Sequence, residues 1–82
     1  MIYGMYSIRD SKTGFMAPIA ENNDAVATRN FSNAVGQPNS VLGSHPGDFD
    51  LYKVGLFDSD SGIMTELSAP EFVVSATSLK EV

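Results

Sequence analysis

One predicted strand with two apolar faces constrains this chain more than any other feature of its sequence. The segment spans residues 49–57 and reads FDLYKVGLF. Side chains alternate between the faces of a strand, which gives two apolar sets: Tyr52, Val54 and Leu56 on one face, and Phe49, Leu51 and Phe57 on the other. Such a strand lies in the middle of a covered sheet, or one of its faces is covered by a partner subunit.

The length of the chain strengthens the second alternative. Its 82 residues provide for a single domain, residues 1–82, and a domain of this size is only marginally stable alone. The chain has no Cys, so it forms neither a disulfide nor a thiolate zinc site. Small domains without such supports often oligomerise. We therefore expect a homodimer or a higher oligomer.

Turn and cap residues divide the chain into two hairpins that flank one helix. Strand-like residues 2–9 and 15–17 surround a turn at 10–14, and Pro18 ends this first hairpin. An N-cap at Asn22 or Asn23 begins the helix, which ends at Gly36, a predicted C′ residue. One apolar stripe marks its buried side: Ala27, Phe31, Ala34 and Val35.

Residues 36–48 predict a long loop, in which Val41 and Leu42 are able to reach the core. The second hairpin pairs residues 49–57 with 63–67, Pro70 interrupts it, and residues 72–77 form a short last strand. The predicted fold class is α+β. Its order is ββαββ plus the last strand, with an antiparallel sheet and the helix on one face.

The two predicted turns repeat each other. Residues 10–16, DSKTGFM, align with residues 58–64, DSDSGIM. Either two hairpins use the same favourable turn independently, or one hairpin is a duplicate of the other. In both cases we expect the Asp side chain to accept backbone N–H bonds and the Gly to adopt a left-handed conformation.

No motif for catalysis, metal binding or nucleotide binding is present. The chain has no G-x-G-x-x-G, Walker or G-x-S-x-G pattern. Residues from Asp58 onward resemble a calcium loop, but positions 6 and 12 hold Ile63 and Ala69 where an EF-hand needs Gly and Glu. His45 is the one imidazole, with Asp48 and Asp50 nearby, and we interpret it as structural. The sequence predicts no enzyme activity, no metal and no cofactor.

The N-terminal sequence and the net charge indicate where the protein acts and what it is able to bind. The N-terminus shows no basic leader before an apolar run, and no apolar stretch approaches the length of a membrane span. We therefore expect a soluble cytoplasmic protein that is not secreted and has no membrane partner. The net charge of −5 disfavours non-specific binding to DNA or to anionic membranes.

Aromatic residues in the predicted strands form the candidate site. Rings on a sheet beside basic side chains are a common surface for stacking and holding single-stranded nucleic acid. The candidate residues are Tyr3, Tyr6 and Tyr52 for stacking, and Arg9, Lys12, Arg29 and Lys53 for phosphate contacts. The alternative is that the aromatics form the core or a dimer seam, which the acidic net charge favours.

Three segments together resemble a known protein family. Residues 6–15, 23–31 and 44–58, the last followed by Gly62, are similar to the small nonstructural protein of gokushovirus-type microviruses. These are tailless phages with circular single-stranded DNA genomes. The resemblance implies a place in the bacterial host cytoplasm and absence from the mature capsid. It also implies a part in viral DNA replication or packaging, or DNA binding, and it supplies no catalytic residues.

The leading hypothesis is therefore a non-enzymatic phage protein that acts in single-stranded DNA replication or packaging. Its partners would be a second copy, single-stranded DNA, and replication or packaging proteins. The alternative is a protein-interaction adaptor that modulates a host or phage replication protein without contacting DNA. Clustering of the basic residues on the surface would discriminate between the two hypotheses.

Overall fold

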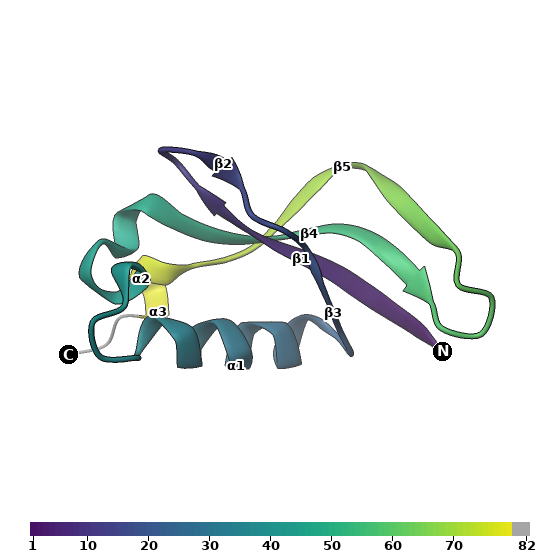
Figure 1. Cartoon of the computed structure of the whole chain (residues 1–82), viewed down its shortest axis with the longest axis horizontal. Helices are drawn as coiled ribbons and strands as arrows, with labels where there is room; N and C mark the ends of the chain where they lie inside the picture. Colours follow the sequence, from purple (N-terminus) through teal and green to yellow (C-terminus); the bar gives the residue numbers. More distant parts are fainter. Residues whose placement is uncertain (80–82) are drawn as a thin grey trace.

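A computed structural model describes residues 1–79 of the chain. Five strands form one antiparallel sheet: β1 (Ile2–Asp10), β2 (Gly14–Phe15), β3 (Ile19–Glu21), β4 (Phe49–Asp58) and β5 (Met64–Ser75). The strand order is β2-β1-β4-β5, and β3 also pairs with β1. The helix α1 (Asp24–Val35) lies along one face, and no helix of the described chain covers the other (Figure 1). The predicted α+β class with its helix on one face is confirmed.

The helix α1 forms where its cap and its apolar stripe predict it. Asn23 is the N-cap, and its side chain accepts a hydrogen bond of 2.9 Å from the Val26 N–H. Its buried side chains pack with both sheet and C-terminal residues in a single core: Tyr6, Ala27, Phe31, Val35, Phe49, Leu51 and Ala76. The helix ends at Gly36 as predicted, although Gly36 is the C-cap residue and has a right-handed conformation, with φ −82°.

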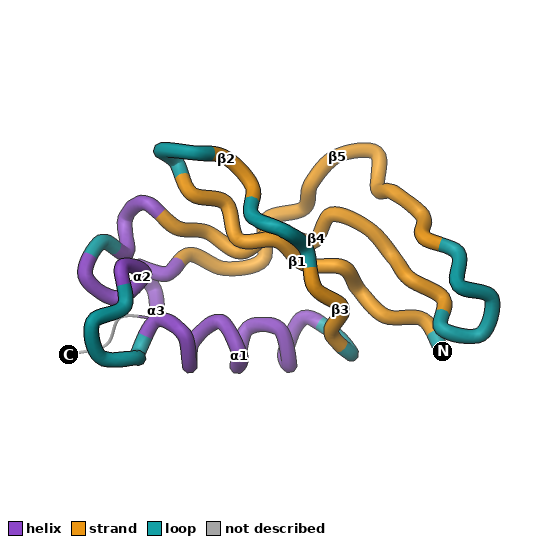
Figure 2. Tube along the Cα trace, viewed as in Figure 1, coloured by secondary structure: helices purple, strands orange, loops and turns teal. Residues whose placement is uncertain are grey.

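The predicted loop at 36–48 contains two short helical segments. These are α2 (Val41–Ser44) and the 3₁₀ turn η1 (Pro46–Asp48). With α3 (Ala76–Leu79) they gather at one end of the sheet (Figure 2). The Ser40 hydroxyl caps α2 by accepting a bond from the Leu42 N–H. Leu42 packs against the core as predicted, whereas Val41 is exposed.

A bulge in β4 changes which side chains share a face. Met5 pairs with Gly55 and Tyr6 with Lys53, so Val54 has no partner on β1. Two residues that pair across neighbouring strands point their side chains to the same face of the sheet. One extra residue in a strand therefore moves every later side chain of that strand to the opposite face. Tyr52 and Phe57 therefore lie together on the face turned away from α1, which we call the outer face. The predicted assignment of these two residues to opposite faces is wrong.

The strand β5 runs through Pro70 without ending. Lys53 pairs with Glu71 and Gly55 with Glu66, so a bulge of four residues, 67–70, lies opposite Val54. Because β5 is an edge strand, Pro70 does not have to donate to a neighbouring strand. The predicted separate last strand is wrong, since residues 72–75 continue β5 and Ala76 begins α3.

The three long strands extend beyond the helix. The described chain measures 41 × 22 × 18 Å, and β1, β4 and β5 continue past the first turn of α1 toward the N-terminus (Figure 1). We call this part, residues 1–4 and 56–66, the distal ribbon. No helix of the described chain is long and apolar enough to cross a membrane.

Candidate functional site

Three aromatic rings form a row across the outer face. Phe15 of β2, Tyr52 of β4 and Phe72 of β5 meet edge to face, with ring centroids 5.4 and 5.8 Å apart. Phe15 is 47% exposed and Phe72 is 59% exposed. Between the first two rings lies Ser7 of β1, the ladder partner of Tyr52. Because Ser7 is small, the rings of Phe15 and Tyr52 are able to meet across β1.

Two of the candidate basic residues lie near one end of this aromatic row. Arg9 lies opposite Phe15 on one side and opposite Asp50 on the other, which places it on the outer face. Lys12 lies in the adjoining turn, where its N–H bonds to the Asp10 carboxylate at 2.9 Å. Both side chains are exposed. One end of the row therefore has two cations available, with Asp50 as an acidic neighbour.

The structure separates the other two basic residues from the row. Arg29 is exposed on α1, in the layer beneath the sheet. Lys53 pairs with Tyr6, whereas Arg9 pairs with Asp50, so the two cations lie on opposite faces. Lys53 and Arg9 are therefore not placed to hold the same stretch of nucleic acid on one chain.

Tyr6 belongs to the core and not to a stacking surface. It is 1% exposed, and its hydroxyl donates a hydrogen bond of 2.5 Å to the Asp24 carboxylate. Burial, together with this bond and the nearby negative charge, raises the pKa of Tyr6 well above its usual value of 10. A buried ring has no free face for a base, so the predicted stacking role of Tyr6 is corrected.

Tyr3 and Tyr52 remain in the candidate site, and two further rings join them. Tyr3 is half-buried on the outer face opposite Phe57, in the distal ribbon. Phe15 and Phe72 are not among the stacking residues predicted from the sequence. Pairing residues 2–9 with residues 15–17 across the first turn would have identified Phe15, because the pairing places it opposite Arg9. Phe72 follows Pro70, the residue predicted to interrupt the second hairpin.

His45 shows no arrangement for catalysis. Its Nδ1 lies 2.9 Å from the Ser44 hydroxyl, and the ring is exposed. The Asp48 carboxylate instead accepts a hydrogen bond of 3.2 Å from the Ser11 hydroxyl. Within residues 1–79, no three His, Asp or Glu side chains come together as a metal site.

The outer face combines features that suit binding of a ligand. It offers flat apolar rings, two cations at one end, and a rigid sheet that holds them. Phe15 and Phe72 are about half exposed, so parts of these two side chains remain open to a ligand.

The comparisons with known proteins place the chain among phage proteins. Residues 3–79 match the family model described as Phage ORF5 protein. No curated protein and no solved structure matches the chain. Because the match covers nearly the whole sequence, the chain belongs to the Phage ORF5 protein family.

Proposed function

We propose that this phage protein is non-enzymatic and acts in viral single-stranded DNA replication or packaging by binding single-stranded DNA as an oligomer. The aromatic row Phe15–Tyr52–Phe72 on the uncovered outer face is the observation that carries this proposal. The resemblance to the nonstructural protein of gokushovirus-type microviruses supports the choice of pathway. We accordingly place its action in the bacterial host cytoplasm and outside the mature capsid.

Stacking provides the main attraction in this proposal. A base stacked on an aromatic side chain contributes about 1–3 kcal/mol in single-strand binding. Arg9 and Lys12 are positioned to hold the neighbouring phosphates. Duplex readers typically place a basic helix in a groove, whereas α1 carries Arg29 as its single cation. We therefore expect a preference for single strands.

The test is a titration of fluorescein-labelled 20-nucleotide oligothymidine at low salt, followed by anisotropy. Tyr52→Ala and Phe72→Ala should each weaken binding by about 5- to 150-fold, the range set by one lost stacking contact. Val41→Ala is the matched control, because Val41 is an exposed apolar residue of α2, away from both the row and the distal ribbon. Absence of binding by the unmodified protein at tens of micromolar would reject the proposal.

The charge distribution favours a second candidate function, that of a protein-interaction adaptor. Ten acidic residues oppose five basic ones, and Arg29 and Lys53 lie away from Arg9 and Lys12. In this alternative the outer face binds a host or phage replication protein instead of DNA. Oligothymidine would then fail to bind, while Tyr52→Ala would still disrupt the protein complex.

A further inference from the structure

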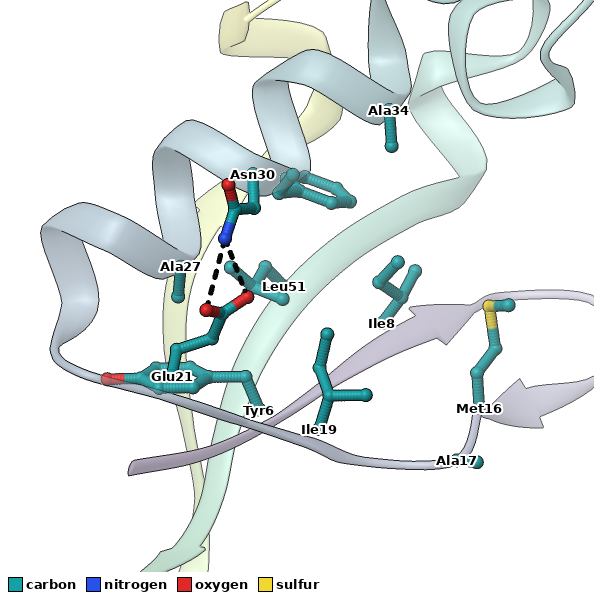
Figure 3. A pocket seen from close by; sticks show the side chains of 11 residues that line it. Tyr6, Ile8, Met16, Ala17, Ile19, Glu21, Ala27, Asn30, Ala34 and Leu51 are labelled. Atoms are coloured by element: carbon teal, nitrogen blue, oxygen red, sulfur yellow. Dashed lines mark hydrogen bonds between the residues drawn. The ribbon is translucent and has the colours of Figure 1, made fainter. Parts of the chain in front are cut away.

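A hollow lies on the side of the sheet that faces α1, between this helix and the segment 16–21. Figure 3 shows the helix along one side of this hollow and the segment along the other, with Ile8 and Leu51 between them. Its lining is almost entirely apolar and includes Met16, Ile19 and Phe31. The hollow is a groove open to solvent at its outer rim, where Ile19 is 60% exposed.

The volume of the groove suits one large apolar side chain. It measures about 160 Å³, and a cavity of about 150 Å³ lined by similar residues accommodates a benzene molecule. The space exists because α1 presents Ala27 and Ala34 toward it, and neither side chain is long enough to fill it. A Phe or Leu side chain from another molecule would fit this volume.

One wall of the groove is a free sheet edge. Among the described strands, β3 pairs with β1 alone. In an antiparallel pair, alternate residues direct their N–H and C=O groups away from the partner strand. An exposed edge of this kind binds an extended peptide through backbone hydrogen bonds, and adjacent pockets select its side chains.

A carboxylate gives the groove its charge preference. The side chain of Glu21 reaches toward the helix at the mouth of the hollow, where the Asn30 amide donates to both of its oxygens at 3.0 Å (Figure 3). No Lys or Arg within residues 1–79 forms an ion pair with it. The charge of Glu21 is therefore not neutralised, and a cationic side chain on a bound peptide would complement it.

We propose that this groove binds an extended segment of a partner protein that carries a large apolar residue near a Lys or Arg. The segment adds along β3, places its apolar side chain between α1 and the sheet, and pairs its cation with Glu21. A second copy of this chain fits poorly. Its exposed Ile63 and Met64 lie beside acidic Asp58 and Asp60, and its Phe15, although it lies beside Arg9, is already packed against Tyr52. The groove is separate from the outer face, so this proposal does not depend on DNA binding.

Three acetylated pentapeptide amides test the proposal: Thr-Phe-Thr-Arg-Thr, Thr-Ala-Thr-Arg-Thr without the apolar anchor, and Thr-Phe-Thr-Glu-Thr with the opposite charge. Binding is followed by NMR through the methyl groups of Ile8, Ile19 and Leu51, which line the groove. We expect the first peptide to shift these methyl groups and to bind at least fivefold more tightly than either of the others.

Variants of the protein locate the site. Glu21→Gln should remove the preference for Arg over Glu in the peptide. Glu66→Gln is the matched control, because Glu66 is an exposed carboxylate on β5, and this variant should keep the preference. Ala34→Leu should fill the groove and abolish binding. If that variant fails to fold, Ile19→Arg at the exposed rim is the second test, and it should likewise abolish binding of the first peptide. Equal binding of the three peptides, shifts outside the groove, or no shift at millimolar peptide would overturn the proposal.

Discussion

The ring of Tyr6 occupies the space above Gly4. A Cβ atom built at Gly4 would lie 2.6 Å from both Cε1 and the hydroxyl oxygen of Tyr6, closer than any tolerated contact. With Gly at this position, the ring lies back along β1 and reaches Asp24 in the first turn of α1. This hydrogen bond joins β1 to the first turn of α1. The sequence did not reveal it, because nothing local distinguishes Tyr6 from Tyr3.

Gly4→Ala should therefore destabilise the protein. The added methyl group must displace the Tyr6 ring, and overpacking of this kind costs about 1–3 kcal/mol. Urea unfolding followed by circular dichroism measures the change in the free energy of unfolding. Gly47→Ala is the control, because a Cβ there meets no atom within 4 Å, and its effect should stay within about 0.5 kcal/mol. Equal effects of the two substitutions would refute this account of Gly4.

Tyr6 also predicts a dependence of stability on alkaline pH. Its pKa is raised in the folded protein, mainly by burial and then by the bond to Asp24. A raised pKa means that its contribution to stability is complete below pH 10, the unfolded value, and is lost as the pH rises above it. The loss amounts to about 1.4 kcal/mol per pH unit in that range.

Urea unfolding at pH 8, 10 and 11 tests this dependence, with Tyr6→Phe as the comparison. The variant lacks the titrating hydroxyl, so its free energy of unfolding should decline less between pH 10 and 11. At pH 8 it should be less stable by about 1.5–3 kcal/mol, the value of a hydrogen bond to a charged group. Tyr52→Phe serves as the control, because Tyr52 lies on the outer face. Parallel pH curves for Tyr6→Phe and the unmodified protein would contradict the assignment.

At the scale of elements, the twin turns were predictable because their geometry is local. The Asp10 carboxylate accepts from the Lys12 N–H, and the Asp58 carboxylate accepts from the Asp60 N–H, both at 2.9 Å. The two glycines have positive φ, 104° at Gly14 and 77° at Gly62. The bond from Asp60 also lowers the pKa of Asp58. The prediction made from the repeated Asp and Gly residues is confirmed in both turns.

Replacing either turn glycine by Ala should cost about 1–2 kcal/mol, because a left-handed conformation strains a residue that has a Cβ. The two turns lie at opposite ends of β1. Their effects should therefore add in the double variant to within about 0.5 kcal/mol. Thermal unfolding of both single variants and the double variant provides the measurement. Gly14→Ala or Gly62→Ala without loss of stability would contradict the role of positive φ.

The faces of β4 were not predictable, because a partner strand sets them. Period-2 alternation assigns Phe57 to the face of Leu51, whereas the unpaired residue Val54 moves it to the face of Tyr52. A local signal exists at Gly55, where a Cβ would lie 2.9 Å from the Thr65 carbonyl oxygen. Glycine inside a strand is typical of a bulge or of close backbone approach. Of the three rings in the aromatic row, Tyr52 alone was predicted from the sequence.

At the scale of the whole molecule, the helix covers only part of the sheet. Around α1 the inner face is buried in the core, but the distal ribbon has no such cover (Figure 1). Its exposed apolar residues are Met1, Ile2, Ile63 and Met64. The two apolar faces of residues 49–57 led us to expect a partner from the sequence. The structure supplies a different reason for the same expectation. The ribbon leaves Ile2 exposed on one face and Met64 on the other, and uncovered apolar residues of this kind commonly mark interaction sites.

We expect the protein to self-associate through the distal ribbon, and Met64→Glu to prevent it. Met64 is 61% exposed in the single chain. A charge there should therefore leave the fold of the monomer intact, while its burial in a dimer interface would be costly. Light scattering at 10–100 µM, about the range in which weak dimers form, should give a dimer mass for the unmodified protein and a monomer mass for the variant.

Ser68→Glu provides the control for this last experiment, because it adds the same charge to an exposed polar position on the same strand. It should remain dimeric, and urea unfolding should show that both variants are folded. Dimerisation would also bring a second pair of Arg9 and Lys12 side chains into the assembly, which the proposed DNA binding by this acidic chain requires. A monomer mass for the unmodified protein would remove that support, because a single chain offers only one such pair beside its aromatic row.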